Sequence, residues 1–354
     1  MKPVKIIISI LAILLVVSCE TRYRMVTTLE RNGKVHREVY AFEKGLGFSA
    51  RDTSKNQFLF HLSPDWKVTC SDTVIKYNFF GDESEYKIKI SKDANSIEQY
   101  SLEIQYDEDM QPYAAPEESL VKKFRWFYTH YSFKTVYKKL KYDAPVSIDD
   151  YLTKKEQILW TQGNMSDLKV MNGTEMNDYL DKINDDFLEW CSRNFFEISF
   201  ESIKKLTTKY DLDTAKEHIY KKIRKEKIEA FDIEPETVCT FLDSFYVTIY
   251  FSNLYKTNKE TIDKDFQRLT SISIFDMGNT ISYELVIQGK LIKTNAPIVA
   301  SDTLIWKVNG MRLLFEDYTL TAEYRMANIW AFIFAGLIII IAIGSFILLR
   351  IRNR

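Results

Sequence analysis

The most constraining feature of the sequence is an apolar segment near its C-terminal end. Residues Ile329–Leu349 include no charged side chain. As a helix that rises ~1.5 Å per residue, this segment has a length of roughly 30 Å, which matches the hydrocarbon core of a bilayer. Trp330 stands where interfacial aromatic residues are common, and three arginines follow within residues 350–354. We therefore predict a transmembrane helix over residues 327–349 and a cytoplasmic basic tail after it.

A second apolar run lies near the start of the chain. Residues Ile6–Val17 follow two lysines and are too few to span a bilayer comfortably, which is typical of a secretory signal peptide. The run ends in Val16-Val17-Ser18-Cys19, which resembles the lipobox of bacterial lipoproteins. We predict a signal peptide over residues 1–18 and lipidation of Cys19, with palmitate among the acyl chains. The alternative is an ordinary signal peptide followed by a chance cysteine.

The two predicted anchors are consistent with one topology. Cleavage before Cys19 leaves the mature N-terminus on the outer leaflet, and a helix that enters the membrane from outside ends with its arginines in the cytoplasm. We therefore expect a single-pass protein of the cytoplasmic membrane with a lipid-anchored N-terminus. Its ectodomain then lies on the periplasmic or extracytoplasmic side, and the lipid bilayer is its first expected partner.

Between the anchors, the residue pattern changes twice. Alternating strand-like patterns dominate residues 19–146, helical spacing dominates 147–268, and strand patterns return in 269–326. We predict an α+β fold, with a mainly antiparallel β-sheet ectodomain, an α-helical insertion and one C-terminal transmembrane helix. Because both ends of the ectodomain must stay near the membrane, we expect residues 22–42 and 280–325 to share one antiparallel sheet.

Two Asn-Gly pairs predict hairpin turns, because both residues accept positive φ angles. The pair at positions 32–33 lies between two β-rich runs, and a two-residue turn there places Met25 opposite Tyr40. The pair at positions 309–310 predicts a second hairpin over residues 303–315.

Residues 124–136 are dense in aromatic side chains, including Trp126 and Phe127. We interpret this run as a central strand that is buried on both faces. A lipid-binding or ligand-binding groove is the alternative interpretation.

Three sequence signals predict where helices begin in the central part of the chain. Thr153 and Glu156 have the spacing of a capping box, and Thr174 is a plausible N-cap for a long amphipathic helix. Pro235 suits the first turn of a further helix.

Part of the sequence resembles a known family. Residues 284–296, followed by 304–307, resemble a pattern in the LppM-type envelope lipoproteins, although Gln288 replaces a proline of that pattern. Residues 124–129 and 322–330 resemble uncharacterised lipoproteins of Bacteroidota-type bacteria. The resemblance implies a role in the cell envelope and supplies no catalytic residues.

Besides Cys19, the chain contains Cys70, Cys191 and Cys239. Three thiols in an oxidising compartment allow one disulfide, and Cys191 with Cys239 is the candidate pair because both lie in or beside the helical part. Three buried free thiols are the alternative.

The sequence offers no motif for catalysis or for metal binding. None of the four histidines, His36, His61, His130 and His218, stands in a zinc-binding spacing, and no nucleophile motif or phosphate loop occurs. We accordingly predict no catalytic residues, no metal and no cofactor. The formal net charge of −1 over 354 residues argues against nucleic acid as a partner.

These observations favour a membrane-anchored envelope lipoprotein without enzymatic activity. Its ectodomain is expected to bind or scaffold an envelope protein, lipid or glycan. The alternative is an envelope hydrolase whose active site is dispersed along the chain. Converging carboxylates or a Cys–His pair in a cleft would favour this alternative.

Overall fold

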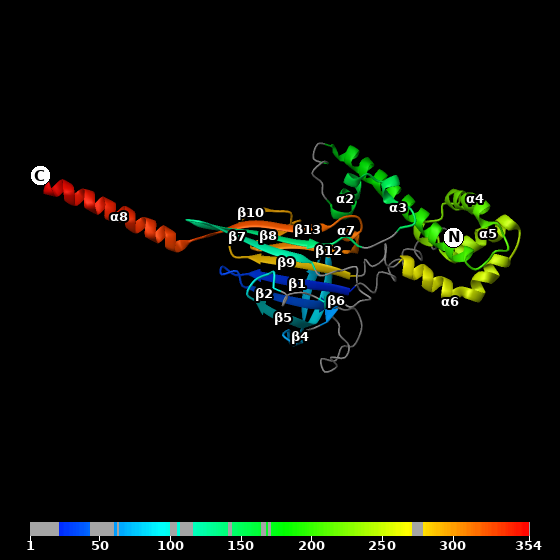
Figure 1. Cartoon of the computed structure of the whole chain (residues 1–354), viewed down its shortest axis with the longest axis horizontal. Coiled ribbons are helices and arrows are strands. Elements are labelled where there is room, and N and C mark those ends of the chain that lie inside the picture. Colours follow the sequence, from blue (N-terminus) through cyan, green and yellow to red (C-terminus); the bar gives the residue numbers. More distant parts are fainter. Residues whose placement is uncertain are drawn as a thin grey trace. The chain divides into compact units, whose positions relative to one another are not determined.

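The computed structural model of the chain describes residues 21–42, 60–61, 64–99, 105–106, 116–140, 144–163, 168, 171–270 and 279–353. The chain divides into two compact units, whose elements are labelled in Figure 1. The β unit comprises Met1–Lys138, Gly278–Asn309 and Asp317–Arg354, and the helical unit comprises Lys139–Met277 and Gly310–Glu316. The predicted α+β class with mainly antiparallel sheets is confirmed.

The larger sheet of the β unit has seven strands in the order β11-β12-β9-β1-β2-β5-β4. Its strands are β1 (Thr21–Leu29), β2 (Val35–Phe42), β4 (Lys67–Phe79), β5 (Asp82–Ala94), β9 (Asn279–Ile287), β11 (Ile298–Ala300) and β12 (Thr303–Asn309). All neighbours in this sheet are antiparallel except β1 and β9, which run parallel.

The second sheet has four antiparallel strands in the order β10-β13-β8-β7. Its strands are β7 (Glu117–Arg125), β8 (Tyr128–Tyr137), β10 (Lys290–Thr294) and β13 (Tyr318–Ala327), and a short pair, β3 (Phe60–His61) with β6 (Gln105–Tyr106), stands apart. The aromatic rings of Phe133, Tyr283 and Trp306 meet between the two sheets at centroid distances of 6.1–6.5 Å. The β unit is therefore a sandwich with an aromatic core.

A buried ion pair joins the two sheets. The Arg37 guanidinium on β2 donates two hydrogen bonds of 2.8 Å to the Glu118 carboxylate on β7, and the Tyr283 hydroxyl donates a third of 3.0 Å. The Arg37 side chain is 1% exposed and that of Glu118 is 7% exposed. Burial alone would lower the pKa of Arg37, but the neighbouring carboxylate outweighs it and raises the pKa. The Arg37 guanidinium therefore stays charged inside the sandwich.

The first hairpin forms where it was predicted, but its register is shifted by one residue. Its tip is a three-residue loop, 31–33, in which Gly33 takes a left-handed φ of 96°. Such a loop ends in a bulge, whereas a two-residue turn has none. Met25 consequently pairs with Val39, and the prediction that it faces Tyr40 is wrong.

The expectation of one shared antiparallel sheet is confirmed only in part. Strand β9 does join β1, but it does so in parallel, and β13 belongs to the four-stranded sheet. Between β1 and β9 the chain completes five strands of the sandwich, β2, β4, β5, β7 and β8, and the segment of the helical unit that precedes β9. A connection of this length can return to the same end of the sheet, as a parallel pair requires.

The second predicted hairpin does not form. Residues 303–309 are a strand as expected, but Gly310–Leu313 is the short helix α7. Leu314 and Phe315, which follow it, belong to the hydrophobic core of the helical unit. Packing of these side chains therefore overrides the local hairpin signal.

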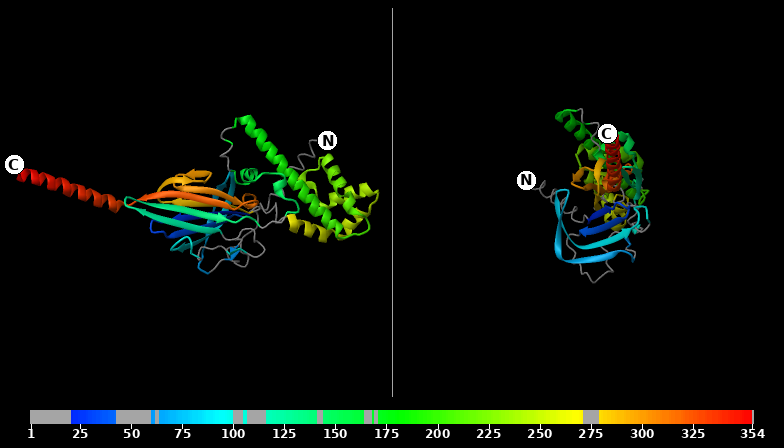
Figure 2. Two further views of the ribbon diagram at one scale, coloured as in Figure 1. Left: turned by 45° about the horizontal axis from the view of Figure 1, so that its top comes forward. Right: turned by 90° about the vertical axis from the view of Figure 1, so that its left-hand side faces the viewer.

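The described residues of the helical unit form five longer helices besides α7. They are α2 (Lys154–Gln162), α3 (Gly173–Lys204), α4 (Leu212–Lys225), α5 (Pro235–Tyr246) and α6 (Tyr250–Thr270), with short 3₁₀ turns at Ile148–Asp150 and Ala230–Asp232. The core of the unit is centred on α3, which contributes Phe187, Trp190, Phe196 and Phe200 among others. Figure 2 shows α3 (green) as the longest helix of this unit.

Two of the three predicted helix starts are confirmed. Thr153 and Glu156 form a reciprocal capping box on α2, and Pro235 occupies the first turn of α5. The prediction that Thr174 caps α3 is wrong. The cap is Asn172, whose side chain accepts a hydrogen bond from the Glu175 N–H while Glu175 bonds back to it.

The Arg37–Glu118 pair yields a test of the sandwich. We expect Glu118→Gln to destabilise the β unit by about 3 kcal/mol, because it leaves the Arg37 charge buried without its counter-ion. Hydrogen–deuterium exchange of the β8 and β9 amides would measure this loss. The matched control is Glu117→Gln, whose side chain is 69% exposed beside Lys138 and should change stability by less than about 0.5 kcal/mol. Equal effects of the two variants would contradict the proposed role of the pair.

Candidate membrane interface

The C-terminal helix α8 (Ile329–Arg352) is long and apolar enough to cross a membrane. It has 24 residues, its most apolar window has a mean hydropathy of 3.0, and none of that window is buried against the protein. Arg350 and Arg352 stand in its last turn. In Figure 2, α8 (red) follows directly after the strands of the β unit.

The aromatic run at residues 124–136 does not form one buried strand, so that interpretation is wrong. It is a hairpin in which β7 ends at Arg125, Trp126 and Phe127 make the turn, and β8 begins at Tyr128. Phe124, Trp126 and Phe127 are 55%, 48% and 40% exposed. A buried strand would hide these rings, whereas the turn displays them.

The displayed rings meet the first turns of α8. Trp330 stacks on Phe124 with a centroid distance of 6.2 Å and meets the edge of Trp126 at 5.4 Å. Phe127 contacts Phe332 at 4.9 Å. Tryptophan at such a helix start favours the boundary between headgroups and acyl chains, because its ring system is largely apolar and carries one polar N–H group. We name these five residues the aromatic collar.

One polar side chain fastens α8 to the hairpin turn. Asn328 precedes α8, and its amide nitrogen donates to the carbonyl oxygens of Trp126 at 3.0 Å and Arg125 at 3.3 Å. Its backbone N–H donates to the Phe127 oxygen at 2.9 Å, and its side-chain oxygen accepts from the Thr129 hydroxyl at 3.0 Å. These bonds satisfy backbone groups that the tight turn leaves without partners in the sheet. Asn328 was not among the predicted site residues, although an asparagine directly before a long apolar run is a recognisable signal of a helix start.

Of the predicted site residues, Cys19 lies outside the described residues. Cys191 and Cys239 are buried free thiols in the structure, and the side chain of Cys70 lies outside the part that the structure describes. Desolvation by burial raises the pKa of each thiol to about 12, which keeps both protonated and poorly nucleophilic near neutral pH.

The histidines do not assemble a catalytic centre in the described part of the chain. His36 places its Nδ1 atom 2.7 Å from an Asp93 carboxylate oxygen and its Nε2 atom 3.5 Å from Glu38. Both ring nitrogens thus face carboxylates instead of a hydroxyl or thiol. His218 contacts the Phe245 ring. No group of three His, Cys, Asp or Glu side chains in this part is arranged to hold a metal ion.

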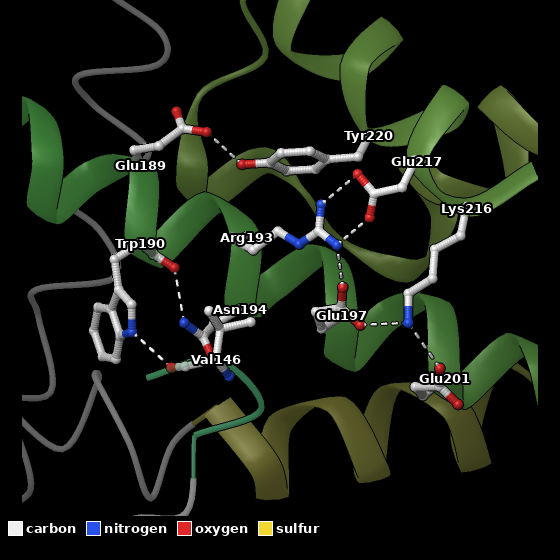
Figure 3. Close-up of polar contacts among 10 residues, drawn as sticks. All are labelled: Val146, Glu189, Trp190, Arg193, Asn194, Glu197, Glu201, Lys216, Glu217 and Tyr220. Atoms are coloured by element: carbon white, nitrogen blue, oxygen red, sulfur yellow. Dashed lines mark hydrogen bonds and ion pairs between the residues drawn. The ribbon is translucent and has the colours of Figure 1, made fainter. Parts of the chain in front are cut away.

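A charged network joins α3 to α4 in the helical unit (Figure 3). Arg193 on α3 contacts the carboxylates of Glu217 on α4 and of Glu197 on α3. Lys216 on α4 reaches Glu197 at 2.6 Å and Glu201 at 3.1 Å. Every carboxylate in this network has a cation partner, so the network is best explained as the structural link between the two helices.

The comparisons with known proteins add little. No protein-family model and no curated protein sequence matches the chain. Among solved structures, the NMR structure of the folded domain of LppM from Mycobacterium tuberculosis aligns with a TM-score of 0.25 and 8% sequence identity, over 87% of this chain and 91% of that one. This structural similarity is weak, and a TM-score this low does not establish a common fold.

The junction between Asn328 and the hairpin can be tested by mutation. We expect Asn328→Ala to raise hydrogen exchange across residues 124–130 by an amount that corresponds to about 2 kcal/mol, because several hydrogen bonds are lost together. The measurement uses the full chain in detergent micelles or nanodiscs. Asn353→Ala, at the far end of α8, is the control and should leave this exchange unchanged. Unchanged exchange in Asn328→Ala would show that the junction is not held by this residue.

Proposed function

We propose that this chain is a single-pass, membrane-anchored protein of the cell envelope whose ectodomain is fastened to its membrane helix. The main support is a contact within the aromatic collar. The rings of the β7–β8 turn pack there against Trp330 and Phe332 at the start of α8. An apolar helix whose membrane-length window is not buried against protein needs lipid around it. The collar and Asn328 place the β7–β8 turn at the level where the helix enters that lipid.

The sidedness follows from charge. Arg350 and Arg352 in the last turn of α8, together with Arg354, favour a cytoplasmic C-terminus by the positive-inside rule. The ectodomain then lies on the extracytoplasmic side of the cytoplasmic membrane. A lipidated Cys19 would give the ectodomain a second attachment to the same leaflet.

The ectodomain acts in this proposal by binding a partner protein. The support is an exposed apolar tip between α5 and α6, where Val247 is 92% and Ile249 is 74% exposed. Val247 has a φ of 51°, which is unfavourable for a β-branched residue. The Asp243 carboxylate holds the loop in this conformation by accepting hydrogen bonds of 2.8 and 2.9 Å from the N–H groups of Phe251 and Ser252. A strained loop that displays aliphatic side chains is typical of a recognition site.

The anchoring can be tested with cysteine variants in intact bacteria that carry the full chain. We expect Cys19→Ser to abolish labelling by a fatty-acid probe, while the protein stays in the membrane through alkaline carbonate washing because α8 still spans it. Cys70→Ser is the matched control and should keep the label. Release of the wild-type protein by carbonate would overturn the proposed anchoring, and labelling of Cys19→Ser would overturn the lipidation site.

The partner role can be tested by crosslinking in native membranes. We expect the double variant Val247→Asn, Ile249→Ser to lose a crosslinked protein at least about tenfold relative to wild type, since each buried aliphatic side chain contributes ~1.5 kcal/mol or more. Asparagine tolerates the left-handed conformation at position 247. The control, Ile298→Ser with Val299→Ser, removes two exposed aliphatic side chains of the β unit. A partner that survives the tip variant, or no reproducible partner in wild type, would contradict this role.

A further inference from the structure

A row of basic residues crosses the four-stranded sheet close to α8. Lys123 on β7 pairs with His130 on β8, His130 pairs with Arg325 on β13, and Arg325 pairs with Lys290 on β10. Directly paired residues of adjacent strands point to the same face of a sheet. The four side chains therefore stand side by side on one face, and each is exposed or half-exposed. We name them the basic row.

The basic row lies close to the membrane end of the β unit. Arg325 precedes Asn328 by three residues and Lys123 precedes the collar residue Trp126 by three, so neither backbone position can be more than about 10 Å from the junction between α8 and the β7–β8 turn. The headgroup layer of a bilayer adds about 5–8 Å beyond the hydrocarbon core on each side. Lysine and arginine side chains can extend toward such a layer from their backbone positions.

Within the part of the chain that the structure describes, no carboxylate neutralises the lysines and the arginine of the basic row. Among the described residues, no ion pair joins Lys123, Lys290 or Arg325 to a carboxylate, and Arg325 instead lies over the Tyr128 ring at 4.5 Å. The nearest acidic residue along the same face is Glu323, which pairs with Ser132 and Lys293 in the next row. Cations without a carboxylate partner at a sheet face attract anions that can approach within hydrogen-bonding distance of them.

We propose that the basic row binds the phosphate groups of anionic phospholipids in the leaflet that α8 enters. The proposal rests on the proposed function, because it requires α8 to be in the membrane. The position of the basic row beside the membrane helix indicates that lipid is the ligand. Strand β13, which carries Arg325, leads directly into α8, and the hairpin that carries Lys123 also carries three rings of the collar. A row of positive charge beside a membrane-inserted aromatic collar combines the two features that anchor proteins at anionic lipid surfaces. The row thereby selects the lipids around the helix and holds the β unit against the surface.

The test uses the full chain reconstituted into phosphatidylcholine vesicles with trace amounts of spin-labelled phosphatidylglycerol or spin-labelled phosphatidylcholine. We expect wild type to restrict the motion of phosphatidylglycerol preferentially at low salt. The triple variant Lys123→Gln, Lys290→Gln, Arg325→Gln should reduce that preference at least about threefold, since each basic residue near an anionic surface strengthens its attraction roughly fivefold. Salt at 0.5 M should weaken the wild-type preference, because it screens the charges.

The control variant is Lys67→Gln, Lys134→Gln, Lys307→Gln, which removes the same number of charges from the β unit outside the basic row. The arginines after α8 are present in every variant, so only the difference between variants reports on the row. An unchanged preference in the triple variant, or an equal loss in the control, would overturn the proposal. Displacement of the labelled lipid by inorganic phosphate, beyond the effect of chloride at equal ionic strength, would assign the row to soluble phosphate instead.

Failure of the proposed function gives a different result. If α8 does not span the bilayer, carbonate washing removes the chain from the vesicles before any lipid preference is measured. If the chain stays and the lipid preference does not depend on the basic row, only the present inference fails.

Discussion

The junction between α8 and the β7–β8 turn is the contact on which the rest of the arrangement depends. An apolar helix without a protein partner would otherwise be an independent tether. Asn328 bonds to three consecutive carbonyl groups of the turn, and Trp330 packs on Phe124 and Trp126. The depth of the helix in a membrane and the height of the β unit above it are therefore coupled. Both proposals about the membrane follow from that coupling.

The sandwich gives this junction a rigid base. Glu118 and Phe124 lie on the same strand, β7, and Glu118 is held by Arg37 across the interface between the sheets. A strand fixed at one end by a buried ion pair and at the other by Asn328 has little freedom to move its rings. The helical unit has a separate core centred on α3, so it can carry an exposed tip at Val247 without weakening the sandwich.

Local signals in the sequence predicted the features that depend on neighbouring residues. Three signals depend only on the helix in which they lie: the apolar segment, the Thr153 capping box and Pro235. The helices that they predict are all present in the structure. Some of the failures involve competition between local and distant contacts. The Asn309-Gly310 pair favours a hairpin, but burial of Phe315 in the helical unit produces α7 there.

The sequence by itself determined that this protein has an α+β body and one helix suited to a bilayer, because composition and periodicity are properties of contiguous residues. Only the tertiary structure decided that the rings near Trp126 form a turn against α8, and that Lys123, His130, Arg325 and Lys290 align. Strand register sets which residues share a row, and a single bulge shifts it, so a pattern along one strand cannot reveal a cluster that four strands create together.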